Sequence, residues 1–384
     1  MLPRRQGEAP YLCWSRCLRV PSLASGKQIM LYFYSFIFTA ILSFLVTIFV
    51  RKLANRFGIV DRPDSPRKIH NHPIPLLGGL GAFAAFWAVI LILTLGYDLF
   101  PARYISSSDL WAIFIGGALL MLGGWIDDKY NLAPRWQFIF PILAVLVVLS
   151  ARIGISFVTN PLGGGLWHLD QWRVGSFLIL ADSFTVLWLL GTMYTTKLLD
   201  GLDGLVSGIT VISAFIIFAL SLTHKTYQTD VALLAIVLAG ALAGFLFWNF
   251  QPAKIFLGEG GSVWVGFMLG VLAIISGGKV ATALLVMGVP ILDVVWVIIR
   301  RMVVEKKSLG ESDAKHLHFR LLTAGLSQRK SVLVLWGFSA LFGVTSLFLQ
   351  TRGKVYSLLI LLFATIILAL WVTKRSKQSL TPRP

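Results

Sequence analysis

Apolar stretches of about 20 residues recur along almost the whole chain, and they limit its possible folds more than any other feature. Each stretch is long enough to cross the hydrocarbon core of a bilayer as one α-helix. Hydrophobic residues make up 57% of the 384 residues and charged residues only 13%, whereas a soluble protein carries roughly 25% charged residues. The sequence therefore predicts an all-α integral membrane protein with short loops, and it leaves no room for a large soluble domain.

The apolar pattern predicts about eleven transmembrane helices in one polytopic domain at 29–373. The expected spans are 29–50, 78–96, 108–126, 136–153, 177–195, 204–223, 230–249, 262–277, 281–300, 331–350 and 355–373. A basic tail follows at 374–384, and because the number of spans is odd, this tail is expected on the side opposite to the N-terminus.

A basic N-terminal extension at 1–28 precedes the first expected span. It has neither the apolar core nor the cleavage site of a secretory signal. Met30 stands where the first span begins, which makes it a candidate for the true start. The only two cysteines, Cys13 and Cys17, also lie in this extension and indicate neither a disulfide framework nor a zinc site.

Lysine and arginine are distributed unequally between the two sides of the membrane. The loops that alternate to one side, together with the tail, carry 22 of them, whereas the loops of the other side carry 7 and the N-terminal extension 5. Positive residues favour the cytoplasm, so we expect the first side to be cytoplasmic. The net charge of +17 is spread over short loops that flank helices, which argues against a nucleic-acid partner.

Carboxylates gather at the cytoplasmic ends of the expected spans, although the chain has only 17 acidic residues. Asp127 and Asp128 end the third span, Asp200 and Asp203 follow the fifth, and Glu259 follows the seventh. Each one alone would suit a solvated helix end. Adjacent like charges repel, however, and such groups persist when they share a cation or a proton. Carboxylates with few imidazole or thiolate neighbours favour Mg²⁺, or Mn²⁺, over zinc.

Basic side chains are expected on the same membrane surface as these acids. They are Lys197, then Arg67, Lys68, His70 and His72 in the loop after the first span, and His316, His318 and Arg320 in the loop at 302–330. Carboxylates that hold Mg²⁺ and cationic side chains together are suited to a diphosphate substrate. The residues therefore predict a metal–phosphate site at the membrane surface, and by themselves they do not identify the substrate.

Six motifs in this order resemble those of a known family, the polyprenyl-phosphate N-acetylhexosamine-1-phosphate transferases of the bacterial cell envelope. The motifs are RKIHNHPIPLLGG, GGWIDDKYNLAP, LLDGLDGLVSG, NFQPAKIFLGEGGS, PILDVVWVIIRR and KHLHFRLLTAGLS, between residues 30 and 373. The resemblance implies transfer of a sugar-1-phosphate, from GlcNAc or a close N-acetylhexosamine, from a UDP-sugar to undecaprenyl phosphate with release of UMP. It also implies ten or eleven helices around a cytoplasmic cleft with one Mg²⁺, in the bacterial inner membrane.

The motif matches imply roles for individual residues. Asp127 and Asp128 take the place of the paired aspartates near the lipid phosphate and the metal, and Asp200 lies beside the diphosphate. The implied metal ligands are Glu259, Asp127 and Asp128. The implied substrate-binding residues are Lys68, His70, Lys197, Gly201, Leu202, Asp203, Asn249, His316, His318 and Arg320, among which 201–203 would line the nucleoside pocket.

Three positions depart from the family pattern. Lys197 stands where the family mostly has asparagine, Glu259 where it has a metal-binding aspartate, and Phe319 where it has a third histidine. The first two changes affect the same metal site. We therefore expect Lys197 and Glu259 to form a pair that retunes the charge around the diphosphate; an inactive relative is the alternative interpretation.

Two other functions remain as alternatives. The sibling transferase that uses UDP-MurNAc-pentapeptide performs the same chemistry, but it usually shows a Thr-Pro-Thr-Met-Gly-Gly stretch and three motif histidines, where this chain has IPLLGG and HLHF. A transporter would carry acids near the bilayer midplane. Only Asp293 and Asp182 meet that condition. The oligomeric state is open, with a dimer among the options.

Overall fold

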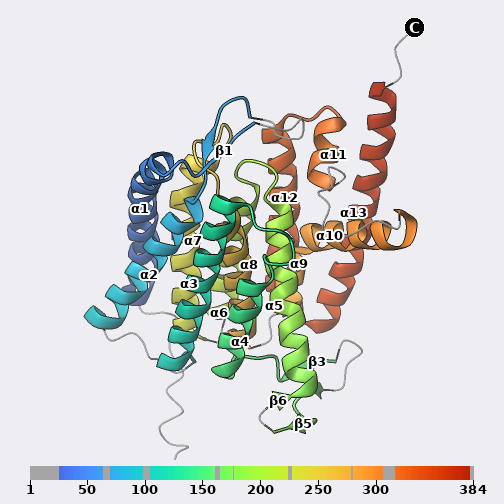
Figure 1. The fold of residues 1–384 in the computed structure, drawn as a ribbon. Helices are drawn as coiled ribbons and strands as arrows, with labels where there is room; N and C mark the ends of the chain where they lie inside the picture. The colour runs from blue at the N-terminus through green and yellow to red at the C-terminus, as the bar shows by residue number, and fades with distance from the viewer. Residues whose placement is uncertain are drawn as a thin grey trace, which may run out of the picture.

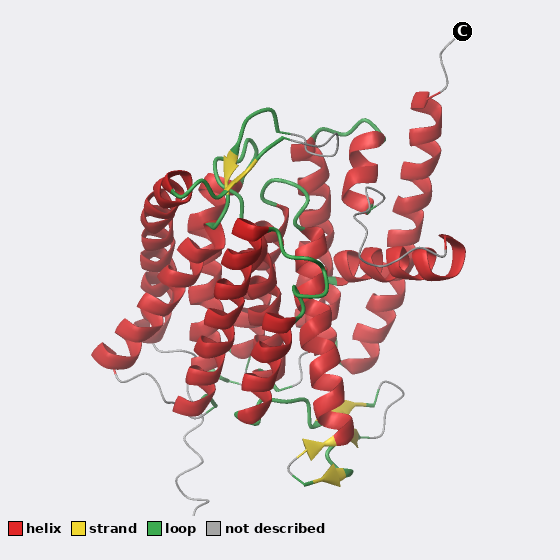
Figure 2. Ribbon diagram, viewed as in Figure 1, coloured by secondary structure: helices red, strands yellow, loops and turns green. Residues whose placement is uncertain are grey.

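The computed structural model describes residues 26–63, 70–97, 104–160, 165–175, 177–223, 227–277, 280–305 and 316–380. Most of its helices run side by side along one direction, and α10 lies across them (Figure 1). The short strands lie at the two ends of this bundle, while some loops also run beside its middle (Figure 2). The described part of the chain is therefore a helical bundle, which confirms the predicted all-α class.

The helices follow the apolar stretches of the sequence closely. They are α1 (Gly26–Arg56), α2 (Gly78–Tyr97), α3 (Ser107–Tyr130), α4 (Ile139–Ser150), α5 (Ile179–Leu199), α6 (Leu205–Ser221), α7 (Thr229–Asn249), α8 (Gly258–Ile275), α9 (Val280–Val286), α10 (Gly288–Ile299), α11 (Leu317–Thr323), α12 (Gln328–Phe348) and α13 (Thr351–Leu380), with a π-helical turn at Arg300–Glu305. The N-terminal extension lies outside the described residues up to residue 25, and α13 continues into the tail, of which 381–384 lies outside.

Short antiparallel strand pairs connect some of the helices. β1 (Val60–Asp61) pairs with β2 (Ile74–Pro75), β3 (Phe157–Thr159) with β4 (Leu166–His168), and β5 (Arg173–Val174) with β6 (Phe177–Leu178). The last two pairs lie together at the end of the bundle opposite to β1 and α11 (Figure 1).

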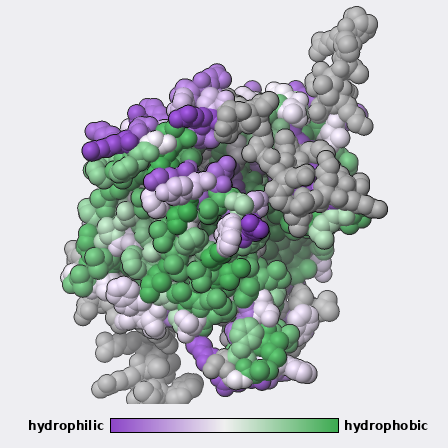
Figure 3. Space-filling model, viewed as in Figure 1, coloured by the Kyte–Doolittle hydropathy of each residue, from purple (hydrophilic) through white to green (hydrophobic). Residues whose placement is uncertain are grey.

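Several helices are long and apolar enough to cross a bilayer. By length and composition, seven described helices qualify, namely α1, α2, α3, α7, α8, α12 and α13. Shorter apolar helices are α4, with 12 residues, and α6, with 17. A belt of hydrophobic side chains covers the middle of the visible face, between polar ends (Figure 3). The chain is thus a multi-pass membrane protein, although the predicted count of eleven spans is not confirmed.

The ninth expected span, 281–300, is not one continuous helix. It is divided into α9 and α10, whose axes differ by 82°, and the pair adds at most an eighth span to the seven. Pro290 lies in the first turn of α10, where a residue without a backbone N–H is tolerated, whereas further inside a helix it would remove a hydrogen bond. The break itself was not predicted, because apolar composition does not reveal it.

The central helix of the bundle is α8, which is buried along almost its whole length. Glycines allow its neighbours to approach closely. A Cβ at Gly124 of α3 would come within 2.1 Å of Gly260 Cα, and a Cβ at Gly79 of α2 within 2.2 Å of Gly261 Cα. Small residues at such crossings are typical of helix packing in membranes, where close backbone contact replaces the hydrophobic effect.

The packing of α8 also determines where polar groups meet. Asp127 lies near the C-terminal end of α3, Asp200 directly follows α5, and Glu259 lies in the first turn of α8, which runs in the opposite direction. These residues are therefore at one end of the bundle, and the strands β3 to β6 are at the other (Figure 1). The sequence predicts that the end with the carboxylates faces the cytoplasm.

We expect single cysteines placed in 127–135 to be protected from a membrane-impermeant thiol reagent added to intact cells, and cysteines at 165–168 to be labelled. The 22-to-7 distribution of lysine and arginine is the reason. Cys13 and Cys17 are first replaced by serine to remove background labelling. Labelling of 127–135 from outside would contradict the assigned orientation.

Candidate active site

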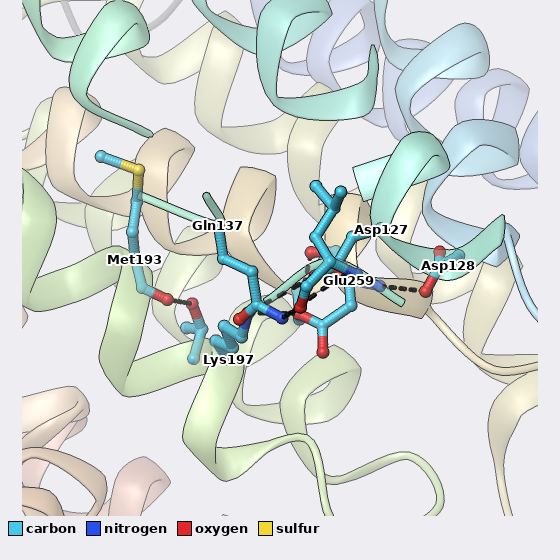
Figure 4. A network of polar contacts seen from close by, with 9 residues as sticks. Asp127, Asp128, Gln137, Met193, Lys197 and Glu259 are labelled. Atoms are coloured by element: carbon cyan, nitrogen blue, oxygen red, sulfur yellow. Dashed lines mark hydrogen bonds and ion pairs between the residues drawn. The ribbon is translucent and has the colours of Figure 1, made fainter. Parts of the chain in front are cut away.

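Side chains from α3, α5 and α8, with one from the segment before α4, form a polar network at the carboxylate-bearing end of the bundle (Figure 4). It contains Asp127 and Asp128 of α3, Gln137, Lys197 of α5, and Glu259 of α8. Five residues far apart in the sequence are thus brought together, and the sequence predicted four of them as site residues.

Lys197 is the centre of this network. Its Nζ lies 2.8 Å from Glu259 Oε2 and donates to Gln137 Oε1 at 2.8 Å. The same ammonium is 3.9 Å from Asp127 Oδ2. The side chain is 17% exposed, so most of it is enclosed by protein. The expected pair between Lys197 and Glu259 is confirmed, and Lys197 also contacts a second acid, Asp127, and the amide of Gln137.

Asp127 is held mainly by hydrogen bonds within its own segment of chain. Its Oδ1 accepts the backbone N–H of Leu132 at 2.9 Å and the Nε2 of Gln137 at 3.2 Å. Gln137 Nε2 also donates to the carbonyl oxygen of Leu132 at 3.1 Å. Because Gln137 binds both Asp127 and Lys197, it fixes the orientation of the lysine toward the acids.

Asp128 interacts with the first turn of α8. Its Oδ1 accepts the backbone N–H of Glu259 at 3.2 Å. Gly258 has a φ of +77°, and a Cβ there would lie 2.7 Å from Asp128 Oδ2, so glycine is needed for this approach. Free N–H groups and the helix dipole make the start of a helix favourable for a negative charge. Asp128 therefore supplies a hydrogen-bond acceptor to the start of α8.

The side chains at this point do not fit a divalent metal ion. The expected ligands were Asp127, Asp128 and Glu259, and Mg²⁺ needs oxygens at about 2.0 to 2.1 Å from its centre. Lys197 Nζ instead occupies the contact with Glu259 Oε2 and is the nearest cation to Asp127. Among the described residues, no three His, Cys, Asp or Glu side chains are arranged to hold a metal. A requirement for Mg²⁺ stays a prediction of the sequence.

The loop after α5 is fixed to the loop after α7. Asn249 is buried, its Oδ1 accepts the N–H of Gly204 at 3.1 Å and the hydroxyl of Ser207 at 2.7 Å, and its Nδ2 donates to the carbonyl of Ile255 at 3.2 Å. Asp203 Oδ2 accepts the N–H of Ala253 at 3.0 Å. These two expected substrate-binding residues thus hold the loop 200–204 in place.

Three further expected residues lie in that loop: Asp200, Gly201 and Leu202. Burial, followed by the charges of Glu259 and Asp203, raises the pKa of Asp200 to about 8. Burial also raises the pKa of Asp203, while its hydrogen bond from Ala253 lowers it. Leu202 is 3% exposed and belongs to the hydrophobic core. The acids of this loop therefore interact electrostatically with the network around Lys197.

The histidine motif is held by an aspartate of α10. Asp293 Oδ2 lies 2.8 Å from His316 Nδ1, and its Oδ1 accepts the N–H of Leu317 at 2.8 Å, at the start of α11. The rings of His316 and His318 are stacked, with centroids 5.6 Å apart. Asp293 was the main acid that a transporter would use. Its engagement with His316 gives it a different role, that of positioning α11.

His318 faces the loop after α5 with an unpaired polar ring. Both ring nitrogens are buried and lack a hydrogen-bond partner among the described residues. Burial is the main reason that the pKa of His318 is lowered to about 3, so the ring is neutral at pH 7. A Cβ at Gly201 would come within 2.5 Å of His318 Nε2. His318 is thus in contact range of the loop that carries Asp200, with donor and acceptor capacity unused.

The remaining expected residues do not all join the network. Arg320 donates through Nη2 to the carbonyl of Ala369 at 2.9 Å and to the hydroxyl of Thr373, so it binds α11 to α13. His70 Nε2 lies 3.6 Å from Asp61 Oδ2, and its ring contacts that of Phe256. Lys68 lies outside the described residues. A substrate-binding role for these three stays a prediction.

Sequence reasoning missed Gln137 as a site residue. Its partners are Asp127 and Leu132 nearby and Lys197, which is 60 positions further along the chain. The only feature of the sequence that could have identified it is the single amide of Gln137 at the start of an apolar stretch, in APRWQFIFP. A polar side chain is costly there unless it is hydrogen-bonded, so its position indicates a partner without identifying it.

Two cavities border the network. One of about 20 Å³ has Asp127, Gln137, Lys197 and Glu259 in its wall. The other, of about 180 Å³, lies between α2, α3 and α8 and is apolar apart from Asp128; its wall includes Leu80, Met121 and Trp125. Asp128 therefore separates an apolar space from the polar network.

Comparison with known proteins agrees with this arrangement. Residues 110–277 match the model of glycosyl transferase family 4. A probable undecaprenyl-phosphate N-acetylglucosaminyl 1-phosphate transferase of Bacillus subtilis is 30% identical over 339 residues, which are 87% of this chain and 88% of that protein. A decaprenyl-phosphate N-acetylglucosaminephosphotransferase of Mycolicibacterium smegmatis is 33% identical over 82% of each chain, and an Escherichia coli undecaprenyl-phosphate alpha-N-acetylglucosaminyl 1-phosphate transferase is 26% identical over 78% of each.

The contact between Gly201 and His318 provides a test of the site. In Gly201→Ala, the new Cβ would lie 2.5 Å from His318 Nε2 and 2.9 Å from Phe319 Cζ, so the rings of His318 and Phe319 must be displaced. We expect the catalytic rate to fall by about 10-fold to 10²-fold, because small displacements of positioned groups are costly. Gly191→Ala, where nothing lies within 4 Å, is the control and should keep the normal rate. Equal rates in both variants would show that His318 does not contribute to the active site.

Proposed function

Because this chain belongs to the polyprenyl-phosphate N-acetylglucosamine-1-phosphate transferases of glycosyl transferase family 4, we propose that it transfers GlcNAc-1-phosphate, or that of a close N-acetylhexosamine, from a UDP-sugar to undecaprenyl phosphate. UMP is the second product. The observation that carries this proposal is the network of Asp127, Asp128, Lys197 and Glu259 at one end of a membrane-spanning bundle.

The proposed reaction is a phosphoryl transfer. An oxygen of the lipid phosphate attacks the phosphorus that is bonded to the sugar oxygen, and the bond from that phosphorus to the oxygen bridging the two phosphates breaks. That oxygen leaves with UMP, and the sugar phosphate is joined to the lipid phosphate as a new diphosphate. Catalysis of such a step rests mainly on positioning and on stabilising negative charge.

The two adjacent aspartates would have different roles in this step. Oδ1 of Asp128 is bonded to the N–H of Glu259, while Oδ2 remains to accept a proton from the lipid phosphate. The apolar cavity beside Asp128 supports this assignment, since it offers isoprenoid units a place next to the reacting phosphate. Asp127 has Oδ1 occupied by Leu132 and Gln137 and acts through the orientation of Gln137 and Lys197.

The site would lie at the cytoplasmic face of a bacterial inner membrane, where UDP-sugars are made. The 22-to-7 distribution of positive residues supports this orientation. A transporter is not favoured, because Asp293 is bonded to His316 and the other clustered acids lie at one end of the bundle. The IPLLGG and HLHF stretches, which differ from the sibling transferase, disfavour UDP-MurNAc-pentapeptide as the donor.

A direct assay tests the proposed reaction. Purified protein is incubated with undecaprenyl phosphate and one of a panel of UDP-sugars, both with Mg²⁺ and with a chelator, and UMP and lipid-linked product are measured. We expect UMP and product in equal amounts with UDP-GlcNAc or a close N-acetylhexosamine. Absence of UMP with every donor, in protein that is correctly folded, would contradict the proposed function.

Replacement of single carboxyl groups by amides tests the residue roles. We expect Asp127→Asn, Asp128→Asn and Asp200→Asn each to lower turnover by about 10²-fold or more, equivalent to about 3 kcal/mol in the barrier. Asp170→Asn, at an exposed carboxylate of the opposite end, is the matched control and should retain the normal rate. Normal turnover in all three site variants would show that these acids do not take part.

A further inference from the structure

Lys197 is held more tightly than a surface lysine would be. Glu259 Oε2 and Gln137 Oε1 each lie 2.8 Å from its Nζ, and only 17% of its side chain is exposed. An ammonium has three N–H donors, and these two contacts use two of them. The third remains for a further acceptor, and Asp127 Oδ2, at 3.9 Å, is too distant for a good hydrogen bond.

The surrounding carboxylates require a cation. Asp127 and Glu259 both approach the lysine, and Asp128 accepts a hydrogen bond from the first turn of α8. Partly buried negative charges destabilise one another unless a positive charge lies among them. Proteins often supply a divalent metal for that purpose. In this protein a lysine side chain is present at that point.

A metal and the lysine cannot occupy the contact with Glu259 together. Mg²⁺ lies about 2.0 to 2.1 Å from its ligand oxygens and repels a neighbouring ammonium, whereas Nζ already lies 2.8 Å from Glu259 Oε2. The cavity beside these groups measures only about 20 Å³, which is roughly the space of one water molecule. Gln137, which is bonded to Asp127, further limits movement of the lysine.

We propose that the Lys197 ammonium replaces the divalent cation in this active site. It neutralises Asp127 and Glu259, and its third N–H donates to an oxygen of the nucleotide-sugar diphosphate. The second part of this inference rests on the proposed transfer reaction, whereas the first part concerns cation binding alone. The consequence is a transferase that turns over without a divalent metal, and this replaces the expectation of Mg²⁺ at that position.

Metal binding without substrate tests the first part. The purified full-length protein is titrated with Mn²⁺, and bound ion is measured by electron paramagnetic resonance. We expect no site with one Mn²⁺ per chain in the wild-type protein at submillimolar concentration. We expect such a site in Lys197→Asn, where the carboxylates lose their cation, but not in Lys330→Asn, which removes an exposed lysine of α12. One tightly bound Mn²⁺ per chain in the wild type would overturn the proposal even if every variant misfolded.

Turnover in a chelator tests the second part. We expect the wild type to keep its rate in EDTA, and Lys197→Asn to lose about 10²-fold there, as expected on removing one charged donor from a transferring phosphate. Added Mg²⁺ should restore part of the rate of Lys197→Asn and leave the wild type unchanged. Lys197→Arg keeps the charge and should lose less. A wild type that stops in EDTA and recovers with Mg²⁺ would overturn the proposal.

The double variant Lys197→Asn/Glu259→Asp tests whether the two positions act together. We expect it to retain more activity in Mg²⁺ than the product of the two single losses, because the shortened acid and the amide together leave room for a metal. Strictly multiplicative losses would contradict the coupling. If no donor gives UMP under any condition, the proposed function fails, while the Mn²⁺ titration still decides whether Lys197 replaces the metal.

Discussion

The close crossing of α8 with α3 is the constraint on which the site depends. At Gly124 and Gly260 the two backbones approach so closely that a Cβ on Gly124 would lie 2.0 Å from the backbone nitrogen of Gly260. Asp127 and Asp128 come one turn after Gly124, and Glu259 directly precedes Gly260, so the crossing point determines which acids meet. A larger residue at Gly124 would separate the helices and with them the carboxylates.

Much of this architecture was predictable from local patterns. Apolar stretches predict helices because a bilayer leaves the backbone no other way to satisfy its hydrogen bonds, and acids at helix ends predicted the position of the site. The pair of Lys197 and Glu259 was predicted because both residues differ from the family pattern at the same metal site. The break between α9 and α10 was not predictable, since Pro290 in an apolar run is compatible with either a kink or a helix start. Gln137 and Asp293 were missed as site residues because their partners are distant in sequence.

The bend between α9 and α10 helps to explain how the histidine motif reaches the carboxylates. Helix α10 lies across the bundle, below α11 in the view of Figure 1. Its Asp293 accepts the backbone N–H of Leu317 and contacts His316 Nδ1. Arg320 binds the other side of α11 to α13. A helix of seven residues is too short to be stable alone, so these tertiary contacts keep His318 against Gly201.

The pairing of Lys197 with Glu259 limits the order in which these positions can change during evolution. A lysine that arose first, beside an aspartate and a bound metal, would place two cations in one small space and repel the metal. A glutamate that arose first at position 259 would keep the negative charge of the aspartate. It could contact either the metal ion or the later lysine. The path through glutamate is therefore the less costly one. We expect intermediates of this lineage to carry the longer acid together with an amide at the lysine position.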